Sequence, residues 1–305
     1  MNRNDTADYQ IMQVSGFSFV RNGIKLGYPV AEAIRSILPI CDEFIIAVGK
    51  SEDDTLEQIK AIGDSKIRII ETEWDKKMFI RGQINSFQTN IALKECKGDW
   101  SFYVQADEVV HEKFLPLIKS KMEEFKDDDE VEGLLFSYLH FWGSYEYYQD
   151  SRRWYRHEIR VIKNNLGIES WESAQGFRRE SRKIRVAKID ADIYHYGWVR
   201  PPMVMKEKQI AFQSLRHDEE WLQKEFKTTP EEFAYGDPTF LAKFRGTHPE
   251  VMKDKIKELN WDFLKGKYAG NPHEKIFSRI RSYFEDKVLH YRIGEYKNYI
   301  LLKNR

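Results

Sequence analysis

Two carboxylates follow a short apolar run near residue 100. Asp107 and Glu108 come directly after Trp100–Val104, in the context Trp-Ser-Phe-Tyr-Val-Gln-Ala-Asp-Glu. A carboxylate at the end of a strand can hold Mg²⁺ or Mn²⁺ against a diphosphate, because hard cations prefer oxygen ligands. Such a metal neutralises charge on a departing group. A solvated acidic turn is the alternative interpretation.

A second group of residues suited to chemistry lies in the segment from Asp190 to Trp198. A neutral imidazole at His195 would serve as a second metal ligand or would contact phosphate groups. The alternative is a structural histidine that closes a strand. Trp198 would stack on a sugar face or pack in the core.

The elements that must position these residues alternate in the first half of the chain. Strand-length apolar runs are Val14–Val20, Glu43–Val48, Ile67–Ile70 and Trp100–Val104. Helical patterns separate them over Tyr28–Leu38, Asp53–Ile62 and Gln83–Cys96. This alternation predicts an α/β fold with a mostly parallel sheet covered on both faces. Ligands bind beyond the carboxyl ends of such strands, so we expect the loops Gly49–Thr55 and Gln105–Glu108 to lie at one edge of a cleft.

The second half of the chain has a different pattern. Strands are predicted over Val131–Trp142, His157–Ile162 and Lys183–Tyr194. Amphipathic helices are predicted over Val204–Leu215, Asp218–Phe226, Glu250–Glu258 and Ile276–Leu289. The aromatic-rich segment Phe141–Tyr155 would form either a carbohydrate-binding wall or a subunit interface in a homo-oligomer. A basic cluster would contact pyrophosphate or an anionic acceptor, or would form ion pairs with acids such as Asp150, Glu158 and Glu180; it comprises Arg152, Arg153, Arg156, Arg160, Arg178, Arg179, Arg182 and Lys183.

Composition excludes several classes of protein. The 305 residues carry 49 basic and 49 acidic side chains, and this balance argues against nucleic acid as the main partner. No apolar run approaches the roughly 18–20 residues of a membrane span, so membrane association is at most peripheral. The polar start, Met1–Gln10, lacks the apolar region of a secretory signal. Cys41 and Cys96 lack metal-type spacing and are expected to be reduced, so we expect a cytoplasmic protein.

The order of these motifs resembles the family-2 glycosyltransferases of GT-A fold. The resemblance rests on a first strand ending in Val20-Arg21-Asn22, a loop Val48-Gly-Lys-Ser-Glu-Asp-Asp-Thr55, and Gly98-Asp-Trp100 leading into Gln105-Ala-Asp-Glu108. It covers roughly residues 13–125 well. It implies a GT-A-like catalytic domain over residues 1–200, with a donor half at about 10–125 and an acceptor half at about 126–200. A mainly helical C-terminal extension over 201–305 would follow.

The resemblance also implies roles for individual residues. Asp107 matches the metal-binding aspartate, with His195 as a second ligand of the divalent cation (Mn²⁺ or Mg²⁺). The residues expected to bind the donor are Asn22, Ser51, Asp53, Thr55, Gln105 and Trp198. Two departures stand out. Gly49 replaces an aspartate that often contacts the nucleobase, and Gln105 replaces the first aspartate of the metal motif. A glutamine can still hydrogen-bond a ribose hydroxyl, but it adds no charge.

The acceptor side needs a carboxylate that removes the hydroxyl proton. Glu169 and Glu172 precede the last predicted strand, and Glu172 is preferred; a solvated loop is the alternative. The leading hypothesis is therefore metal-assisted, inverting sugar transfer from a nucleotide-sugar to a carbohydrate or lipid-linked acceptor, as in polysaccharide biosynthesis. One alternative is a catalytically silent nucleotide- or carbohydrate-binding protein. Another is a nucleotidyltransferase, although the loop Phe17–Gly27 offers only Gly23 and Gly27 for a glycine-rich motif.

Overall fold

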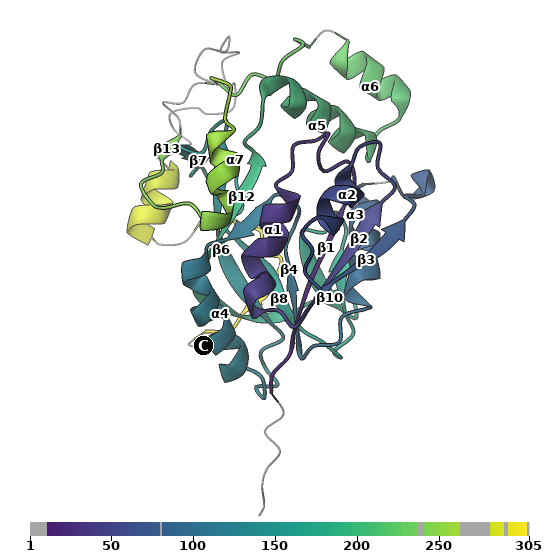
Figure 1. Ribbon diagram of the computed structural model, residues 1–305. Coiled ribbons are helices and arrows are strands. Elements are labelled where there is room, and N and C mark those ends of the chain that lie inside the picture. The colour runs from purple at the N-terminus through teal and green to yellow at the C-terminus, as the bar shows by residue number, and fades with distance from the viewer. Residues whose placement is uncertain are drawn as a thin grey trace, which may run out of the picture.

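The computed structural model describes residues 11–79, 81–227, 229–236, 241–262, 281–289, 292–303 and 305. The helices are α1 (Val30–Ile37), α2 (Thr55–Lys60), α3 (Gln83–Leu93), α4 (Leu115–Glu124), α5 (Pro202–Ser214), α6 (Glu219–Phe226) and α7 (Lys253–Lys257) (Figure 1). The strands of the first half are β1 (Val14–Val20), β2 (Glu43–Gly49), β3 (Ile67–Thr72), β4 (Trp100–Tyr103), β5 (Glu108–Val110) and β6 (Gly133–Trp142). Those of the second half are β7 (Tyr147–Gln149), β8 (His157–Lys163), β9 (Ile168–Trp171), β10 (Gly176–Arg179), β11 (Arg182–Lys183), β12 (Arg185–Trp198), β13 (Ala242–Lys243) and β14 (Ile300–Leu301).

One large curved sheet forms the centre of the fold. Its main path is β13-β7-β6-β8-β4-β1-β2-β3, and β12 joins beside β6 together with β5 and β14. The four strands β3-β2-β1-β4 are parallel, as the sequence predicts for the nucleotide-binding part. The strands β8, β7 and β5 then add antiparallel pairs. A separate three-stranded sheet, β11-β10-β9, lies in the acceptor half.

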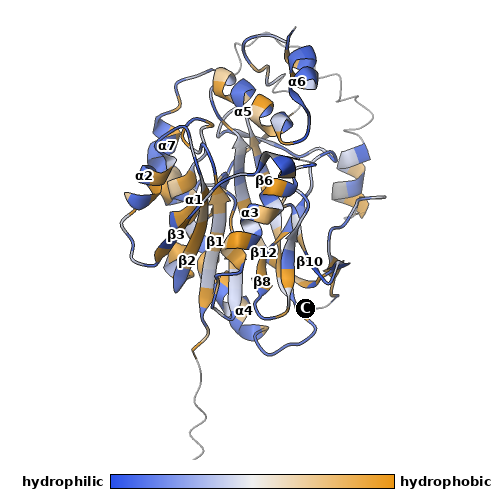
Figure 2. Cartoon of the chain, turned by 90° about the vertical axis from the view of Figure 1, so that its right-hand side faces the viewer, coloured by the Kyte–Doolittle hydropathy of each residue, from blue (hydrophilic) through white to orange (hydrophobic). Residues whose placement is uncertain are grey.

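Alternating side chains of the parallel strands divide the core between the two faces of the sheet. In β2, Phe44, Ile46 and Val48 pack with α1 and α4, whereas Ile45 and Ala47 pack with α3 and β10. This period of two follows from strand geometry, and each fully buried aliphatic side chain contributes about 1.5–3 kcal/mol. The helix α1 buries Val30, Ala33, Ile34 and Ile37, which form one face at helical spacing. Figure 2 shows this apolar interior, whereas α6 at the periphery is mostly hydrophilic.

The chain after residue 200 is tied to the sheet by two strands. The short strand β13 pairs with β7, and β14 pairs with β12. The helices α5 and α6 lie across one end of the sheet, at the top of Figure 1. Of the helix predicted over Ile276–Leu289, residues 276–280 lie outside the described part of the chain, and Glu285–Leu289 forms a π-helix. Among the described residues, no helix has both the length and the apolar character needed to cross a membrane.

Candidate active site

A cavity of about 840 Å³ opens beyond the carboxyl ends of β1 and β4. Residues that follow β1, residues 105–107 after β4 and the end of β12 form its walls, and α5 closes one side. Of the predicted site residues, it is lined by Asn22, Gln105, Asp107, His195 and Trp198. The parallel strands therefore place these polar groups at one edge, where ligands of such sheets bind.

The two loops beyond β1 and β2 hold each other in place. The side chain of Asn22 accepts a hydrogen bond from the backbone of Glu52 (2.8 Å), and the backbone of Asn22 donates to Ser51 Oγ (2.9 Å). Asp53 accepts from the backbone of Lys25 (2.6 Å), while Thr55 Oγ1 accepts from Gly23 N (2.7 Å). Ser51, Asp53 and Thr55 thus shape the loop. Of the residues in these two loops that were predicted to bind the donor, Asn22 lines the cavity.

Both departures from the family pattern have a structural counterpart. A Cβ at position 49 would lie 2.4 Å from Nε1 of Trp74, so Gly49 leaves room for this indole ring. Trp74 lines the cavity, and the Arg21 guanidinium lies 5.5 Å from its ring centroid. Gln105 donates to the carbonyl of Ala174 (3.1 Å), which ties the cavity floor to the acceptor half. Trp74 was not predicted as a site residue, because its contact with Gly49 depends on how β2 and the loop after β3 pack.

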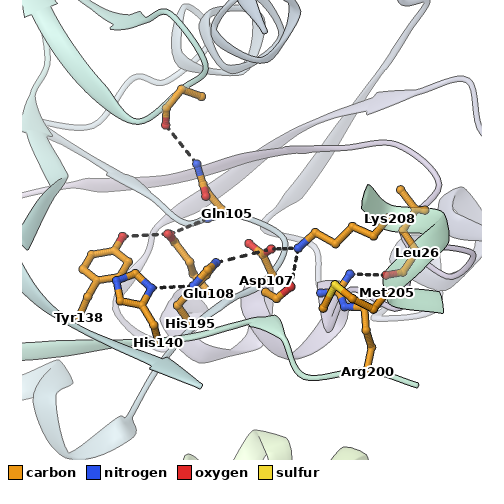
Figure 3. Close-up of polar contacts among 12 residues, drawn as sticks. Leu26, Gln105, Asp107, Glu108, Tyr138, His140, His195, Arg200, Met205 and Lys208 are labelled. Atoms are coloured by element: carbon orange, nitrogen blue, oxygen red, sulfur yellow. Dashed lines mark hydrogen bonds and ion pairs between the residues drawn. The ribbon is translucent and has the colours of Figure 1, made fainter. Parts of the chain in front are cut away.

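Asp107 is the centre of a charged cluster (Figure 3). Its Oδ2 lies 3.1 Å from Nζ of Lys208 on α5 and 3.7 Å from Nε2 of His195 on β12. The Lys208 ammonium also donates to the carbonyl of Gly197 (2.6 Å). Burial raises the pKa of Asp107, but Lys208 and His195 outweigh this effect and hold that pKa well below its usual range. Asp107 is therefore an anion held between two basic groups.

A second histidine sets the orientation of His195. His140 Nε2 lies 2.7 Å from the carbonyl of Tyr155, so this nitrogen carries a proton and donates it. Burial, together with the neighbouring His195, holds the pKa of His140 well below its usual range, so the ring is neutral and its Nδ1 is an acceptor. Nδ1 of His195 lies 2.9 Å away and must donate to it. The remaining nitrogen of His195, Nε2, consequently faces Asp107.

Glu108, the neighbour of Asp107, points into the protein. Its two oxygens each accept a 2.7 Å hydrogen bond from Arg160, and Tyr138 donates a further one of 2.8 Å. Both Glu108 and Arg160 are fully buried, at 0% and 1% exposure. This pair joins β5 to β8 beside the cavity, which Arg160 also lines, and has a structural role.

Two cationic side chains, Lys208 and Arg200, lie close to Asp107. Arg200 is 1% exposed and donates to the carbonyl of Leu26, and its Nε and Nη2 have no hydrogen-bond partner within the part of the chain that the structure describes. Burial and the nearby Arg200 lower the pKa of Lys208 to about 7, although Asp107 opposes this shift. An anion entering here would favour the protonated amine. No pattern in the sequence singled out Lys208, because it lies in a segment that reads as an ordinary amphipathic helix.

A smaller cavity of about 350 Å³ adjoins the first, and the two share Trp154, Tyr155, Glu158 and Gln175 as lining residues. Glu172 lines the smaller cavity from a left-handed turn (φ 48°). Glu169 is exposed on β9 and lines neither cavity. Burial raises the pKa of Glu158 to about 8, and its Oε2 has no hydrogen-bond partner. Glu158 is thus a further carboxylate at the boundary of the cavities.

Some residues of the basic and aromatic clusters form contacts within the protein, and others line the cavities. Arg179 and Arg182 pair with the buried Glu132, and Arg156 pairs with Glu295. These ion pairs join residues far apart in sequence, while Glu158 and Glu180, two of the acids expected to pair with this cluster, interact electrostatically with Arg160 and Arg182. Trp198 stacks on Trp142 at 4.7 Å, so it packs in an aromatic cluster as well as lining the cavity.

The residues around Asp107 do not form a ready site for a divalent metal. Across the described ranges, no group of three or more His, Cys, Asp or Glu side chains is arranged to hold one. Asp107 and His195 supply two ligand atoms, but the Asp107 oxygen that faces His195 already accepts from the Lys208 ammonium. A metal bound to this oxygen and to His195 would compete with this cation. The divalent cation therefore stays a prediction from the sequence.

Comparison with solved structures finds several similar chains. Similar solved structures include S. aureus TarS 1-349 (14% identity, 70% of this chain and 69% of that chain, TM-score 0.38) and a second S. aureus TarS structure (15%, 70% and 42%, 0.38). Another is glucosyl-3-phosphoglycerate synthase from Mycobacterium tuberculosis in complex with Mn²⁺, UDP and phosphoglyceric acid (18%, 42% and 43%, 0.29). The chain spans less than half the length of the last two. No curated protein matches it significantly.

A family model also matches this chain. The family model described as glycosyl transferase family 2 matches residues 29–185, which is just over half of the chain. The matched segment runs from α1 to the start of β12 and contains the parallel strands β2, β3 and β4 as well as Asp107. The α/β architecture is the GT-A type expected from the motifs. The chain belongs to glycosyl transferase family 2.

Proposed function

We propose that the protein transfers a sugar from a nucleoside diphosphate donor to a carbohydrate or lipid-linked acceptor. The observation that carries this proposal is the cavity at the carboxyl ends of β1 and β4, where Asp107 meets Lys208 and His195. Family membership supports the reaction class. The cavity volume of about 840 Å³ lies in the range of small-molecule sites.

The donor would bind with its diphosphate toward Asp107 and its base toward Trp74 and Asn22. This orientation follows from charge, because Lys208 lines the cavity beside Asp107 and the buried Arg200 lies next to it, while Trp74 lines the cavity from the loop after β3. Trp198 and Gln105 line the space between these two ends and would contact the sugar or the ribose.

The acceptor would enter through the smaller cavity, which shares a wall with the donor cavity. In an inverting displacement, a carboxylate there takes the proton of the attacking hydroxyl as the bond to the anomeric carbon forms. We retain Glu172 as the proposed base, because it lines this cavity. Glu158 is the second candidate, since it lines both cavities and its raised pKa suits proton uptake near neutral pH.

Activity and binding measurements test this assignment. We expect the protein to bind at least one of UDP, GDP, ADP and CDP and to release that diphosphate from the matching nucleotide-sugar. Glu172→Gln should lower turnover by about 10²–10⁴-fold without changing donor affinity, because it removes a base and leaves the donor site intact. The same loss in Glu158→Gln alone would move the role to Glu158. Binding without turnover of any nucleotide-sugar would favour the silent binding protein instead.

A further inference from the structure

Lys208 reaches the candidate diphosphate site from a helix that lies outside the family match. It projects from α5, and its ammonium bridges Asp107 Oδ2 (3.1 Å) and the carbonyl of Gly197 (2.6 Å). The side chain is only 12% exposed, yet it lines the larger cavity. Figure 3 shows Lys208 extending toward Asp107 from the side opposite His195. The ammonium thus holds the carboxylate oxygen that also faces His195.

Two aromatic rings lie close to the Lys208 ammonium. The rings of Tyr28 and Trp198 lie 5.0 and 6.0 Å from Nζ, a distance at which aromatic faces attract a cation. An ammonium has three donors, and Asp107 and Gly197 take two of them. Among the described residues the third meets no acceptor, so it is available to a ligand in the cavity.

The local charge balance favours an anionic ligand. Arg200 lies in the same region, with its guanidinium 4.9 Å from the ring of Tyr28, and two of its nitrogens lack partners. Lys208 and Arg200 bring two positive charges close to the carboxylate of Asp107, while Glu52, Glu158 and Glu207 line the cavity together with Arg21, Lys25 and Arg160. The nearby Glu108–Arg160 pair shows a closed arrangement by contrast, because every carboxylate oxygen there is bonded and both side chains are buried.

We propose that the Lys208 ammonium supplies the positive charge that neutralises the leaving diphosphate, so that donor binding and transfer do not require a divalent metal. This inference rests on the proposed function. In the transfer, the bond between the anomeric carbon and the diphosphate oxygen breaks, and its electron pair stays on that oxygen. The acceptor oxygen forms the new bond and gives its proton to the base carboxylate. Lys208 donates a hydrogen bond to the departing diphosphate and is not consumed.

Calorimetric binding of nucleoside diphosphates, with UDP, GDP, ADP and CDP as probes, tests the proposal independently of turnover. Each is titrated in EDTA and in Mn²⁺ against the wild type and against Lys208→Met, Lys208→Arg and Lys206→Met. Lys206 lies on the same helix but lines neither cavity, which makes it the matched control. Thermal unfolding of each variant reports whether the fold is kept.

We expect the wild type to bind its preferred diphosphate with affinities in EDTA and Mn²⁺ that agree within about twofold. Lys208→Met should weaken metal-free binding by about 10–100-fold, the usual range for a lost hydrogen bond to a charged group. Lys208→Arg should restore most of it. In Lys208→Met, Mn²⁺ should recover part of the affinity, because Asp107 and His195 are then free to hold a metal. Lys206→Met should change nothing.

Two results would overturn the proposal while leaving the function standing. The first is wild-type binding at least tenfold weaker in EDTA than in Mn²⁺, which needs no variant to observe. The second is unchanged metal-free binding in a folded Lys208→Met variant, which would make Lys208 a structural ion-pair partner only. A wild type that binds none of the four diphosphates in either condition contradicts the proposed function itself.

Discussion

Asp107 and Glu108 are neighbours in sequence, and their environments differ in almost every respect. Glu108 is fully buried and receives hydrogen bonds from Arg160, Tyr138 and the backbone of Gln105. Asp107 lies at the wall of the cavity, 8% exposed, with one ion pair to Lys208 and His195 at 3.7 Å. One carboxylate is saturated by protein groups, whereas the other has capacity left for a ligand.

This difference separates a stabilising charge from a functional one. A buried carboxylate whose oxygens are all satisfied joins elements, and removal of its charge leaves an uncompensated partner. A carboxylate at a cavity wall orients neighbouring groups. When a mutation removes this carboxylate, water can take its place. The following predictions test this division, from the largest expected effect to the smallest.

Removal of the buried charge should have the largest effect on folding. Glu108→Gln leaves the Arg160 guanidinium buried without an anion, so we expect the free energy of unfolding to fall by about 3–5 kcal/mol in denaturant titrations. Glu123→Gln, on the exposed face of α4, is the matched control and should change it by less than about 0.5 kcal/mol. A loss below about 1 kcal/mol for Glu108→Gln would show that the pair is not structural.

Removal of the cavity carboxylate should affect chemistry instead of folding. In Asp107→Asn the amide still accepts from Lys208 but no longer anchors it by charge. We expect turnover to fall by about 10²–10³-fold, the range seen when one preorganised electrostatic group is lost. The free energy of unfolding should change by about 1 kcal/mol. If turnover at saturating donor is unchanged, both with and without Mn²⁺, then Asp107 has no role in the reaction.

A third buried carboxylate, remote from the cavity, should behave as Glu108 does. Burial raises the pKa of Glu132, but hydrogen bonds from Arg182, the backbone of Arg185 and Arg179 lower it further, to about 2. The folded-state pKa is below the ordinary value of 4.5, so its stabilisation is present above pH 4.5 and is lost as pH falls toward 2. We expect this loss to reach about 3 kcal/mol in wild type. Unfolding titrations of Glu132→Gln should show a flatter acid dependence; an equally steep one would refute the assignment.

The smallest effect is expected for a substitution of Gly197, which lies next to both Asp107 and His195. A Cβ on Gly197 would lie 2.4 Å from His195 Nε2 and 2.8 Å from Asp107 Oδ2. Gly197→Ala must therefore push these two groups apart, and we expect the KM for the donor to rise about tenfold, which corresponds to about 1.4 kcal/mol. Steady-state kinetics would check this. An unchanged KM would mean that the separation of the two side chains does not matter for the donor.

Much of the donor half follows from local sequence patterns. The strands predicted over Val14–Val20 and Glu43–Val48 match β1 and β2 to within a residue, because their apolar runs fill both faces of a covered sheet. The helices α1 and α3 are shorter than predicted, as the terminal turns of such helices often are. The helix α4 was not predicted, since it carries mixed polar and apolar residues with no strong period. The boundary at residue 200 stays a prediction, and β13 and β14 join the later chain to the sheet.

The predicted residues that line the larger cavity either follow strands or lie in the last part of β12, where His195 and Trp198 are found. Asn22, Gln105 and Asp107 were found because a residue at the carboxyl end of a parallel strand has a known place in the fold. Glu169 lines neither cavity, because the β9–β10 hairpin directs it to solvent, a detail that no local pattern encodes. His140 and Glu158 lie within strands that look like ordinary core segments, so nothing in their spacing separates them from their neighbours.

The sequence alone predicted a mostly parallel sheet and the position of Asp107 just beyond the end of one of its strands, because strand periodicity and motif order are local properties. The tertiary structure decided which of two adjacent carboxylates is saturated. Glu108 meets Arg160 from β8, 52 residues later, and Asp107 meets Lys208 from α5, 101 residues later. The strength and role of a charge depend on the groups that surround it in space, and those groups come from elements whose packing the local sequence does not specify.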